Sequence, residues 1–364
     1  MDRTKQIELQ QRFSKEIWEY LCDKNLGCID VAQRVGKTFI AGNMIKTNCV
    51  GEKILIAYPD NQIVSSWELA FKELDINTEN IVLTNFSSLK KYVDNQWFIF
   101  FIDEVHDAGS EKELEKIGKI IDNSIYSLGT SGTLSQETKN RLWELFGMKV
   151  FLTYSAEQAI SDGIISDYSI TIHKAYLDDV IKTKNKQGKL LTEKKKYDNY
   201  SFVIEKMKRE KKNFMFLALQ RNSLAQKSIG KRKKCLELLK QMKDKRVIIF
   251  TGFSEQADNL GIPSFHSKSK EDNMLRFNNL EFNHLALANM GRIGKSYQNL
   301  DSIILLSWTG NEEDVFQRVS RAMLLDYKTK IADIHLICIQ ENSEIKKLEK
   351  ALSLLDQNKI KWNN

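Results

Sequence analysis

The sequence is poor in proline, cysteine and histidine, and each shortage narrows the classes of protein it can encode. Only two prolines, Pro59 and Pro263, occur in 364 residues, so turns must be read from glycine, asparagine and aspartate. The five cysteines are odd in number and scattered, without a C-x-x-C pair, which argues against a disulfide framework or a zinc site. The five histidines are equally dispersed and predict no histidine-built metal centre.

Long apolar runs are also lacking. No stretch of about 18 apolar residues occurs, and the chain begins with the polar sequence MDRTKQIELQQ. We therefore expect neither a membrane-spanning helix nor a signal peptide, and no membrane partner. The scattered cysteines favour a reducing compartment, so the expected location is the cytoplasm, or the host cytoplasm if a phage encodes the protein.

Positive charge is concentrated in one segment. Residues 181–234 contain fifteen Lys and three Arg against four carboxylates, a net charge of +14, whereas the whole chain carries +7. The rest of the chain is therefore acidic. Such a segment predicts a polyanionic partner, and a pair of solvated, lysine-rich helices explains it equally well.

Short apolar runs alternate with helical patterns through the first half of the chain. Several of these runs lack a two-residue period, as do parallel strands that are covered on both faces. Helical patterns at Asn61–Leu74 and Glu111–Ile121 suit crossover connections. The alternation predicts an α/β domain with a doubly wound parallel sheet. Its expected strands are Gly27–Val31, Lys53–Tyr58, Ile81–Thr84, Trp97–Ile102, Ser124–Leu128 and Lys149–Thr153.

A second alternating set predicts another α/β domain of similar size. Its expected strands are Arg246–Thr251, His284–Ala288, Leu300–Leu306 and Ile334–Ile339. The chain is long enough for two cores, and we expect the domains at 1–167 and 244–364.

The residues from 168 to 243 are expected to form a connector with a basic, mainly helical insertion. Strand signal ends there after Tyr168–Tyr176, and helices are predicted at Tyr200–Lys212 and Asn222–Lys243. The tail Asn342–Gln357 has one apolar helical face and is expected to pack on a domain.

The tripeptide Gly36-Lys37-Thr38 follows the first expected strand and opens a helical run. Phosphate binding uses backbone N–H groups at a helix N-terminus, a lysine for the β- and γ-phosphates, and a hydroxyl for Mg²⁺. The tripeptide supplies all three, although the full pattern G-x-x-x-x-G-K-[ST] fails at its first position, Val31. Alone it is a weak signal. The candidate loop comprises Arg34, Val35, Gly36, Lys37, Thr38 and Phe39.

A second motif strengthens the first. The sequence FFIDEVHD places Asp103 and Glu104 at the carboxyl end of the apolar run Trp97–Ile102. Ligands bind at the carboxyl ends of strands in open α/β sheets, where Gly36 to Thr38 are also expected. A carboxylate there can hold Mg²⁺, and a neighbouring glutamate can orient or deprotonate the attacking water. Together the motifs predict a metal–nucleotide site with Thr38 and Asp103 as Mg²⁺ ligands.

A third stretch, SLGTSGTL from Ser127 to Leu134, follows the next expected strand. Small and hydroxylated residues after a strand favour a turn when taken alone. A hinge that senses the neighbouring site is the alternative.

The order GKT, DEVH and GTSGT resembles the motor core of superfamily 2 helicases and translocases of the DEXH type. The resemblance continues across most of the chain, in the family's order of motifs. The further segments that resemble family motifs are AYPDNQIVSSW (Ala57–Trp67), VLTNFSSL (Val82–Leu89), SAEQAISDGIISDY (Ser155–Tyr168), RVIIFTGF (Arg246–Phe253), LALANMGRIGKSYQNLDSIILLSW (Leu285–Trp308) and DVFQRVSRAML (Asp314–Leu324).

The resemblance implies two RecA-like domains that use ATP and Mg²⁺. Lys37 and Thr38 would hold the phosphates and Mg²⁺, Asp103 would position the metal, and Glu104 would position the water.

Further roles are implied by the resemblance for residues outside these two motifs. His106 and Gln317 would couple the nucleotide to the domain interface, and Arg321 would be the arginine finger. The helix that contains Gln10 and Gln11, ahead of the loop, would supply the glutamine that reads the adenine, with Gln11 as the candidate.

The resemblance also implies a nucleic-acid strand gripped mostly at its phosphates, with the basic insertion adding salt-dependent affinity. The DEVH box favours single- or double-stranded DNA over RNA, and a Snf2-like or bacteriophage branch-migration type of motor. Protein partners that supply specificity are a further expectation. The candidate contacts are Thr84, Ser87, Ser88, Thr251, Ser254 and Asn289.

Three positions depart from the family pattern. Arg34 stands where phosphate loops usually carry glycine, and Ser320 and Leu324 replace the glycine and the second arginine of the last motif. Loss of a γ-phosphate arginine slows hydrolysis, because that arginine stabilises transition-state charge. A DNA motor is the principal hypothesis, and a hydrolysis-poor nucleic-acid clamp is the alternative. The second domain with Arg321 disfavours a kinase or a nucleotide switch.

Overall fold

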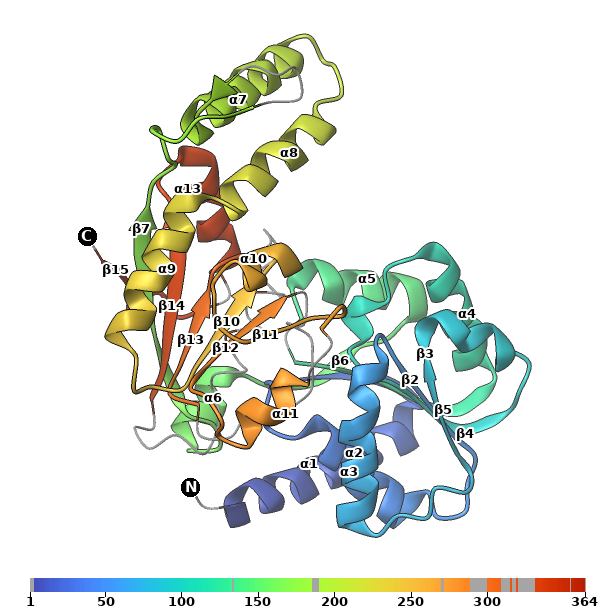
Figure 1. Cartoon of the computed structure of the whole chain (residues 1–364). Coiled ribbons are helices and arrows are strands. Elements are labelled where there is room, and N and C mark those ends of the chain that lie inside the picture. The colour runs from blue at the N-terminus through green and yellow to red at the C-terminus, as the bar shows by residue number, and fades with distance from the viewer. Residues whose placement is uncertain are drawn as a thin grey trace. The chain divides into compact units, whose positions relative to one another are not determined.

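The structure, a computed structural model of the chain, describes residues 3–132, 134–184, 190–269, 272–288, 300–308, 315, 319, 331–353 and 355–363. The chain forms two compact units (Figure 1). The first extends to Ser166, and the second begins at Asp167. None of the described helices is both long enough and apolar enough to cross a bilayer.

The first unit is built on a six-stranded sheet in the order β3-β2-β4-β5-β1-β6. Every pairing within this sheet is parallel. Its strands are β1 (Leu26–Val31), β2 (Ile54–Tyr58), β3 (Ile81–Asn85), β4 (Trp97–Ile102), β5 (Ser124–Ser131) and β6 (Val150–Tyr154). Its helices are α1 (Arg3–Lys24), α2 (Lys37–Asn48), α3 (Val64–Leu74), α4 (Glu111–Asp122), α5 (Gln136–Phe146) and α6 (Ala156–Ser161), with short 3-10 turns η1 (Asn61–Ile63), η2 (Phe86–Lys91) and η3 (Val105–Asp107).

Helices cover both faces of this sheet. On one face, Phe100 and Ile102 of β4 share a core with residues of α4 and α5, including Ile117 and Leu142. On the other face, Trp67 of α3 packs against Phe101, with ring centroids 6.1 Å apart. Successive side chains of a strand point to opposite faces, so the run WFIFFI supplies apolar contacts to both layers. The predicted parallel α/β sheet is confirmed.

The second unit contains a seven-stranded sheet in the order β11-β12-β10-β13-β14-β7-β15, and its pairings are parallel. Its strands are β7 (Asp167–Ala175), β10 (Val247–Thr251), β11 (Ser264–Phe265), β12 (His284–Ala288), β13 (Ser302–Leu305), β14 (Ile331–Ile339) and β15 (Ile360–Asn363). A separate antiparallel pair joins β8 (Thr183–Lys184) to β9 (Leu190–Leu191). The helices are α7 (Glu193–Arg209), α8 (Met215–Gln226), α9 (Ile229–Gln241), α10 (Ser254–Asp258), α11 (Asn273–Asn278) and α13 (Asn342–Ala351), with the 3-10 turn η4 (Gln357–Lys359).

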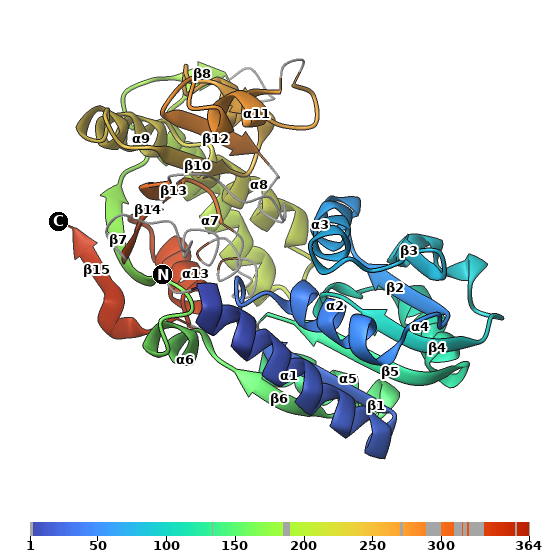
Figure 2. The ribbon, with the colours of Figure 1, turned by 90° about the horizontal axis from the view of Figure 1, so that it is seen from below.

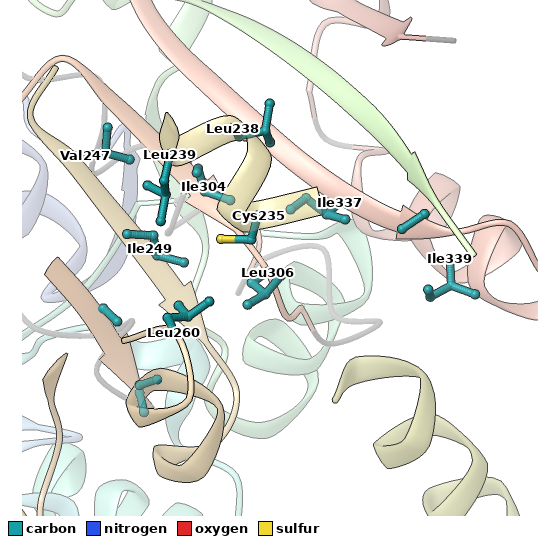
Figure 3. Close-up of a cluster of buried hydrophobic side chains, with 14 of the residues drawn as sticks. Cys235, Leu238, Leu239, Val247, Ile249, Leu260, Ile304, Leu306, Ile337 and Ile339 are labelled. Atoms are coloured by element: carbon teal, nitrogen blue, oxygen red, sulfur yellow. The ribbon is translucent and has the colours of Figure 1, made fainter. Parts of the chain in front are cut away.

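One core cluster of this unit lies between α9 and the sheet (Figure 3). Cys235, Leu238 and Leu239 of α9 belong to the same buried cluster as Ile249 of β10 and Ile304 of β13. Strand β7 pairs along its whole length with β14, so residues from the start of the connecting segment are part of the second sheet.

The predicted helices of the basic segment differ from the observed ones. The single helix expected at Asn222–Lys243 is wrong, because α8 ends at Gln226 and Ser228 caps a new helix by accepting a hydrogen bond from the Lys231 N–H. The helix expected to begin at Tyr200 begins at Glu193, where Thr192 is the N-cap. Both errors come from serine and threonine caps inside stretches whose lysine content does not change at the helix ends.

Two other predicted ends also differ. The tail helix stops at Ala351 instead of Gln357, and β5 continues to Ser131 instead of ending at Leu128. The turn favoured for Ser127 to Leu134 is therefore wrong for its first five residues, which are buried in the strand. Gly129 allows this course, because a Cβ there would lie 2.8 Å from the Sδ of Met148.

Lys231 is a fully buried lysine in the second unit. Its Nζ donates hydrogen bonds to Oε1 of Gln226 and to the carbonyl of Leu306, both at 3.1 Å, and lies 3.7 Å from the ring centroid of Trp308. Burial lowers the pKa of Lys231 to about 7, although the charge of Glu344 opposes the shift.

We expect Lys231 to make stability depend on pH in the alkaline range. Its folded-state pKa of about 7 lies below its ordinary value of 10.5, so the unfolded chain binds more protons between these values. The free energy of unfolding should therefore rise with pH in this window, by at most about 1.4 kcal/mol per pH unit. Lys231→Met should flatten that rise, measured by urea unfolding of the second unit.

Lys240→Met is the matched control, since Lys240 is an exposed lysine of the same helix. It should keep the wild-type slope. Equal slopes in wild type and Lys231→Met would contradict the assignment of the pH dependence to Lys231.

Candidate functional site

The loop between β1 and α2 contains two residues in the left-handed region. Arg34 has a φ of 70° and Gly36 a φ of 102°. A side chain on Gly36 is disfavoured by this conformation, and its Cβ would lie 2.2 Å from Nε2 of Gln10, which would have to move. Among the described residues, no side chain caps α2, which leaves the N–H groups of its first turn available to an anion.

Two glutamines of α1 hold this loop from one side. Nε2 of Gln10 donates to the Val35 carbonyl at 2.9 Å, and Nε2 of Gln6 donates to the Arg34 carbonyl at 3.0 Å. The two are four residues apart and share a helix face. Gln11, the expected adenine reader, is exposed on a neighbouring face, so the structure brings Gln6 and Gln10 to the loop instead.

Asp103 follows β4 as a buried carboxylate with fixed orientation. Its Oδ1 accepts hydrogen bonds from Oγ1 of Thr130 at 2.8 Å and from the Glu104 N–H at 3.1 Å. Its Oδ2 accepts from Nε1 of Trp67 at 3.0 Å. Burial and then the charge of Glu104 raise the pKa of Asp103, against the opposing effect of Lys37 and the hydrogen bonds.

Glu104 adopts a left-handed backbone conformation, with a φ of 49°, and turns its side chain towards the loop. Its Oε1 lies 3.2 Å from Nζ of Lys37 and accepts a hydrogen bond from Nε2 of Gln33 at 3.1 Å. Burial alone would raise the pKa of Glu104, but the charges of Lys37 and His106 outweigh it and lower the pKa to about 2. Glu104 is therefore ionised at neutral pH.

The second oxygen of this carboxylate is buried but keeps its hydrogen-bonding capacity. Among the described residues, Oε2 of Glu104 accepts no hydrogen bond, and it lies 3.5 Å from Nδ1 of His106. Nδ1 of His106 is also 2.8 Å from Oγ of Ser131, the last residue of β5. One histidine thus contacts both Glu104 and the end of the neighbouring strand.

The structure brings Lys37, Asp103, Glu104 and His106 together within the first unit. Thr38 is half-buried in the first turn of α2, and Phe39 is half-buried beside it. The Val35 side chain is fully buried, and the Val35 carbonyl accepts the hydrogen bond from Gln10.

Sequence reasoning missed the side chains that orient these residues. Gln33, Trp67, Thr130 and Ser131 were not proposed as site residues, although the last three lie inside quoted motifs. Gln33 lies at an unspecified position of the phosphate-loop pattern, so its hydrogen bond to Glu104 could not be predicted from the motif.

The candidate nucleic-acid contacts are dispersed over both units. Ser87 and Ser88 in η2 are hydrogen-bonded to Asn85, and Ser254 begins α10. Thr84 and Thr251 are buried, and the Thr251 hydroxyl donates to backbone carbonyls. The remaining predicted residues, Asn289, Gln317 and Arg321, lie outside the described residues, as do Ser320 and Leu324.

Comparison with solved structures shows which known folds this chain resembles. No family model matches the sequence, and no curated protein is significantly similar to it. The helicase domain of Hef from Pyrococcus furiosus superposes with a TM-score of 0.53 at 12% identity, covering 92% of this chain and 96% of that one. The ATP-dependent Type ISP restriction-modification enzyme LlaBIII, bound to DNA, superposes with a TM-score of 0.61 at 14% identity over 97% of this chain.

This chain spans 31% of the LlaBIII chain. At such low identities the likeness is one of fold. The protein has two α/β units with parallel sheets, matching two RecA-like domains and similar in fold to these helicase domains, as the sequence predicted.

We expect the low pKa of Glu104 to depend on Lys37. In Lys37→Met, the burial of Glu104 is no longer offset by the lysine charge, so its pKa should rise from about 2 towards or above its ordinary value of 4.5. Carbon-13 NMR of the side-chain carboxyl carbon, assigned with Glu104→Gln, measures this directly.

Lys139→Met is the control, because Lys139 forms an ion pair with Asp30 of the same sheet at 2.9 Å. That variant should leave the Glu104 signal flat above about pH 4, like wild type. A flat signal in Lys37→Met as well would mean that Lys37 does not set the ionisation of Glu104.

Proposed function

We propose that the protein is an ATP-dependent nucleic-acid motor, and specifically a DNA helicase or translocase of the DEXH type. One observation carries the proposal. Lys37 at the start of α2 and Glu104 after β4 come from motifs 67 residues apart in the sequence and meet at 3.2 Å, with Asp103 beside them. The helicase fold supports the same function.

Binding of ATP would break this ion pair. The triphosphate carries more charge than a carboxylate, and the N–H groups at the start of α2 favour an anion there, so Lys37 would move to the phosphates. Oε1 of Glu104 would then lose the lysine that it faces at 3.2 Å. Because burial raises the pKa of Glu104 when the lysine charge is neutralised, nucleotide binding makes Glu104 a stronger base.

The water that attacks the γ-phosphate would be held by Glu104. Its Oε2 accepts no hydrogen bond among the described residues and can take one from water. His106, 3.5 Å from this oxygen and 2.8 Å from Oγ of Ser131, would pass a change in Glu104 to the end of β5. A glutamate in this role orients or deprotonates the water in phosphoryl transfer.

Mg²⁺ fits the donors at the same edge. The hydroxyl of Thr38 and the carboxylate of Asp103 are hard oxygen ligands, and Trp67 and Thr130 fix the carboxylate. A divalent cation would also offset the charge that raises the pKa of Asp103 beside Glu104. When bound, the ion neutralises charge that develops on the phosphates.

The DNA partner and the DNA-motor subtype are proposed from the sequence. The DEVH box favours a Snf2-like or branch-migration type of motor, and Ser87, Ser88 and Ser254 are candidate phosphate contacts. Gln317 and Arg321 are proposed to complete the ATP site, and protein partners to supply specificity.

A hydrolysis-poor nucleic-acid clamp is the second candidate, and the phosphate loop favours it. Arg34 holds a φ of 70°, a conformation that glycine adopts freely and other residues adopt at a cost. Leu324 stands at the second arginine position of the last motif. Together with Arg34, it is a second departure from the family pattern at a position expected to contact phosphate. A clamp would bind ATP and DNA without rapid turnover.

Glu104→Gln separates the motor from the clamp. In a motor, the substitution should lower DNA-stimulated phosphate release by about 10² to 10⁴-fold, the usual contribution of a general base, while ATP binding persists. Phosphate release with single-stranded, double-stranded and forked DNA, and with RNA, measures it. Glu115→Gln, at an exposed carboxylate of α4, should behave like wild type.

If wild type binds ATP and DNA but releases phosphate no faster than Glu104→Gln, the clamp is correct and the motor is not. Lys37→Ala tests the site itself, because it should abolish ATP binding in either case. Retained ATP binding in Lys37→Ala would place the nucleotide elsewhere.

A further inference from the structure

The helices α7 and α8 form a hairpin that extends from the second unit (Figure 1; Figure 2 gives the view from below). Its base is anchored by side chains. The Tyr197 hydroxyl hydrogen-bonds Ser343, and Lys194 forms an ion pair with Glu341 at 2.9 Å. Residues 202–219, the distal half, continue beyond these anchors.

The distal half exposes large apolar side chains. Phe202 on α7 is 73% exposed, and Met215, Phe216 and Leu219 on α8 are 68%, 67% and 64% exposed. Met215 and Leu219 are one helical turn apart with Phe216 beside them, so they form one stripe. Ile204 of the same hairpin is buried, which means that the packing between the helices is satisfied by other residues.

The sequence of this distal half is rich in positive charge. Residues 202–219 contain five cations and two carboxylates, for a net charge of +3. Glu205 and Glu210 pair with Lys206, Lys208 and Lys212. Within the described part of the chain, Arg209 and Lys211 have no carboxylate at ion-pair distance.

Exposed rings and exposed cations in the same half of a hairpin suit one kind of ligand. Phosphates pair with the cations, and bases stack on the rings, but only where the bases are not already paired in a duplex. An acidic amphipathic peptide would also match an apolar stripe with a basic rim. The positive charge is not confined to a rim, however, because it continues over residues 181–234 at +14, which suits a long polyanion better.

We propose that the distal half of the α7–α8 hairpin is a binding surface for single-stranded nucleic acid, in which Phe202 and Phe216 stack on unpaired bases while Arg209 and Lys211 bind phosphates. The proposal rests on the proposed function for the nature of its partner. It adds a surface outside the helicase motifs and a preference for unpaired bases, and it needs no ATP hydrolysis.

The test measures equilibrium binding of the full-length protein without nucleotide. Fluorescence anisotropy compares a mixed-sequence single-stranded oligodeoxynucleotide with a duplex of the same length. Phe202→Leu/Phe216→Leu keeps apolar side chains but removes the rings. It should weaken single-strand binding at least about tenfold and change duplex binding less than about twofold, since stacking on both rings is lost.

Two companion variants make the result specific. Phe202→Trp/Phe216→Trp keeps flat rings and should bind like wild type. Arg209→Gln/Lys211→Gln should weaken both DNAs and lower the salt dependence of single-strand binding by about 1.4 in log–log slope, because two phosphate contacts are lost. All substituted residues are exposed, and matching thermal unfolding confirms that each variant is folded.

Two outcomes overturn the proposal. If the leucine variant binds single strands like wild type, the stripe is an apolar docking face for a protein. If the leucine variant loses duplex and single-strand binding equally, the rings do not select unpaired bases.

Failure of the motor is a separate result. Ring-dependent single-strand binding without stimulated phosphate release would remove the motor and keep the hairpin surface. If stimulated phosphate release and single-strand binding are both unchanged in the leucine variant, the hairpin surface is removed and the motor is kept.

Discussion

The buried ion pair between Lys37 and Glu104 is the contact that ties the two principal sequence motifs into one site. Its partners start α2 and follow β4, and their charged atoms lie 3.2 Å apart. A buried charge needs a partner, so each residue constrains where the other can lie. The pair also explains why Glu104 takes a left-handed backbone conformation, since that turn directs its carboxylate to the loop. Local strain is thereby offset by a tertiary contact.

Adjacent carboxylates in this site have opposite electrostatic surroundings. Burial and its neighbour's charge raise the pKa of Asp103, whereas Lys37 and His106 lower that of Glu104 despite burial. Asp103 accepts hydrogen bonds from Trp67, Thr130 and a backbone N–H, but one oxygen of Glu104 accepts none from the described residues. A fixed carboxylate suits a metal-positioning role, and one that keeps hydrogen-bonding capacity suits a role with water. The two residues are neighbours in sequence, so the opposite shifts of their pKa values come from the side chains that surround each carboxylate.

The sequence predicted the strands of the first sheet, the central strands of the second, the loop and the two carboxylates, because continuous apolar runs and tripeptide motifs are local signals. It missed the short strands β11 and β15 at the edges of the second sheet. Contacts set by tertiary packing escaped it. The choice of Gln10 over Gln11 depends on the rotation of α1 about its axis, and the roles of Trp67 and Thr130 depend on which strands lie beside β4. The helix break at Ser228 was missed because lysines continue across it, and only a side-chain cap marks the new start.

Two glycines beside the ion pair leave room around its buried lysine. A Cβ on Gly132 would lie 2.8 Å from Nζ of Lys37 and 2.3 Å from Nε2 of Gln33, and one on Gly36 would meet Gln10 at 2.2 Å. These contacts involve the ends of flexible side chains, so the glycines leave room for the lysine and the two glutamines without opening the core. The proposed movement of Lys37 from Glu104 to a phosphate would need such room. The end of β5 therefore contributes twice to the site, because Gly132 beyond it leaves room for Lys37 and Thr130 within it orients Asp103.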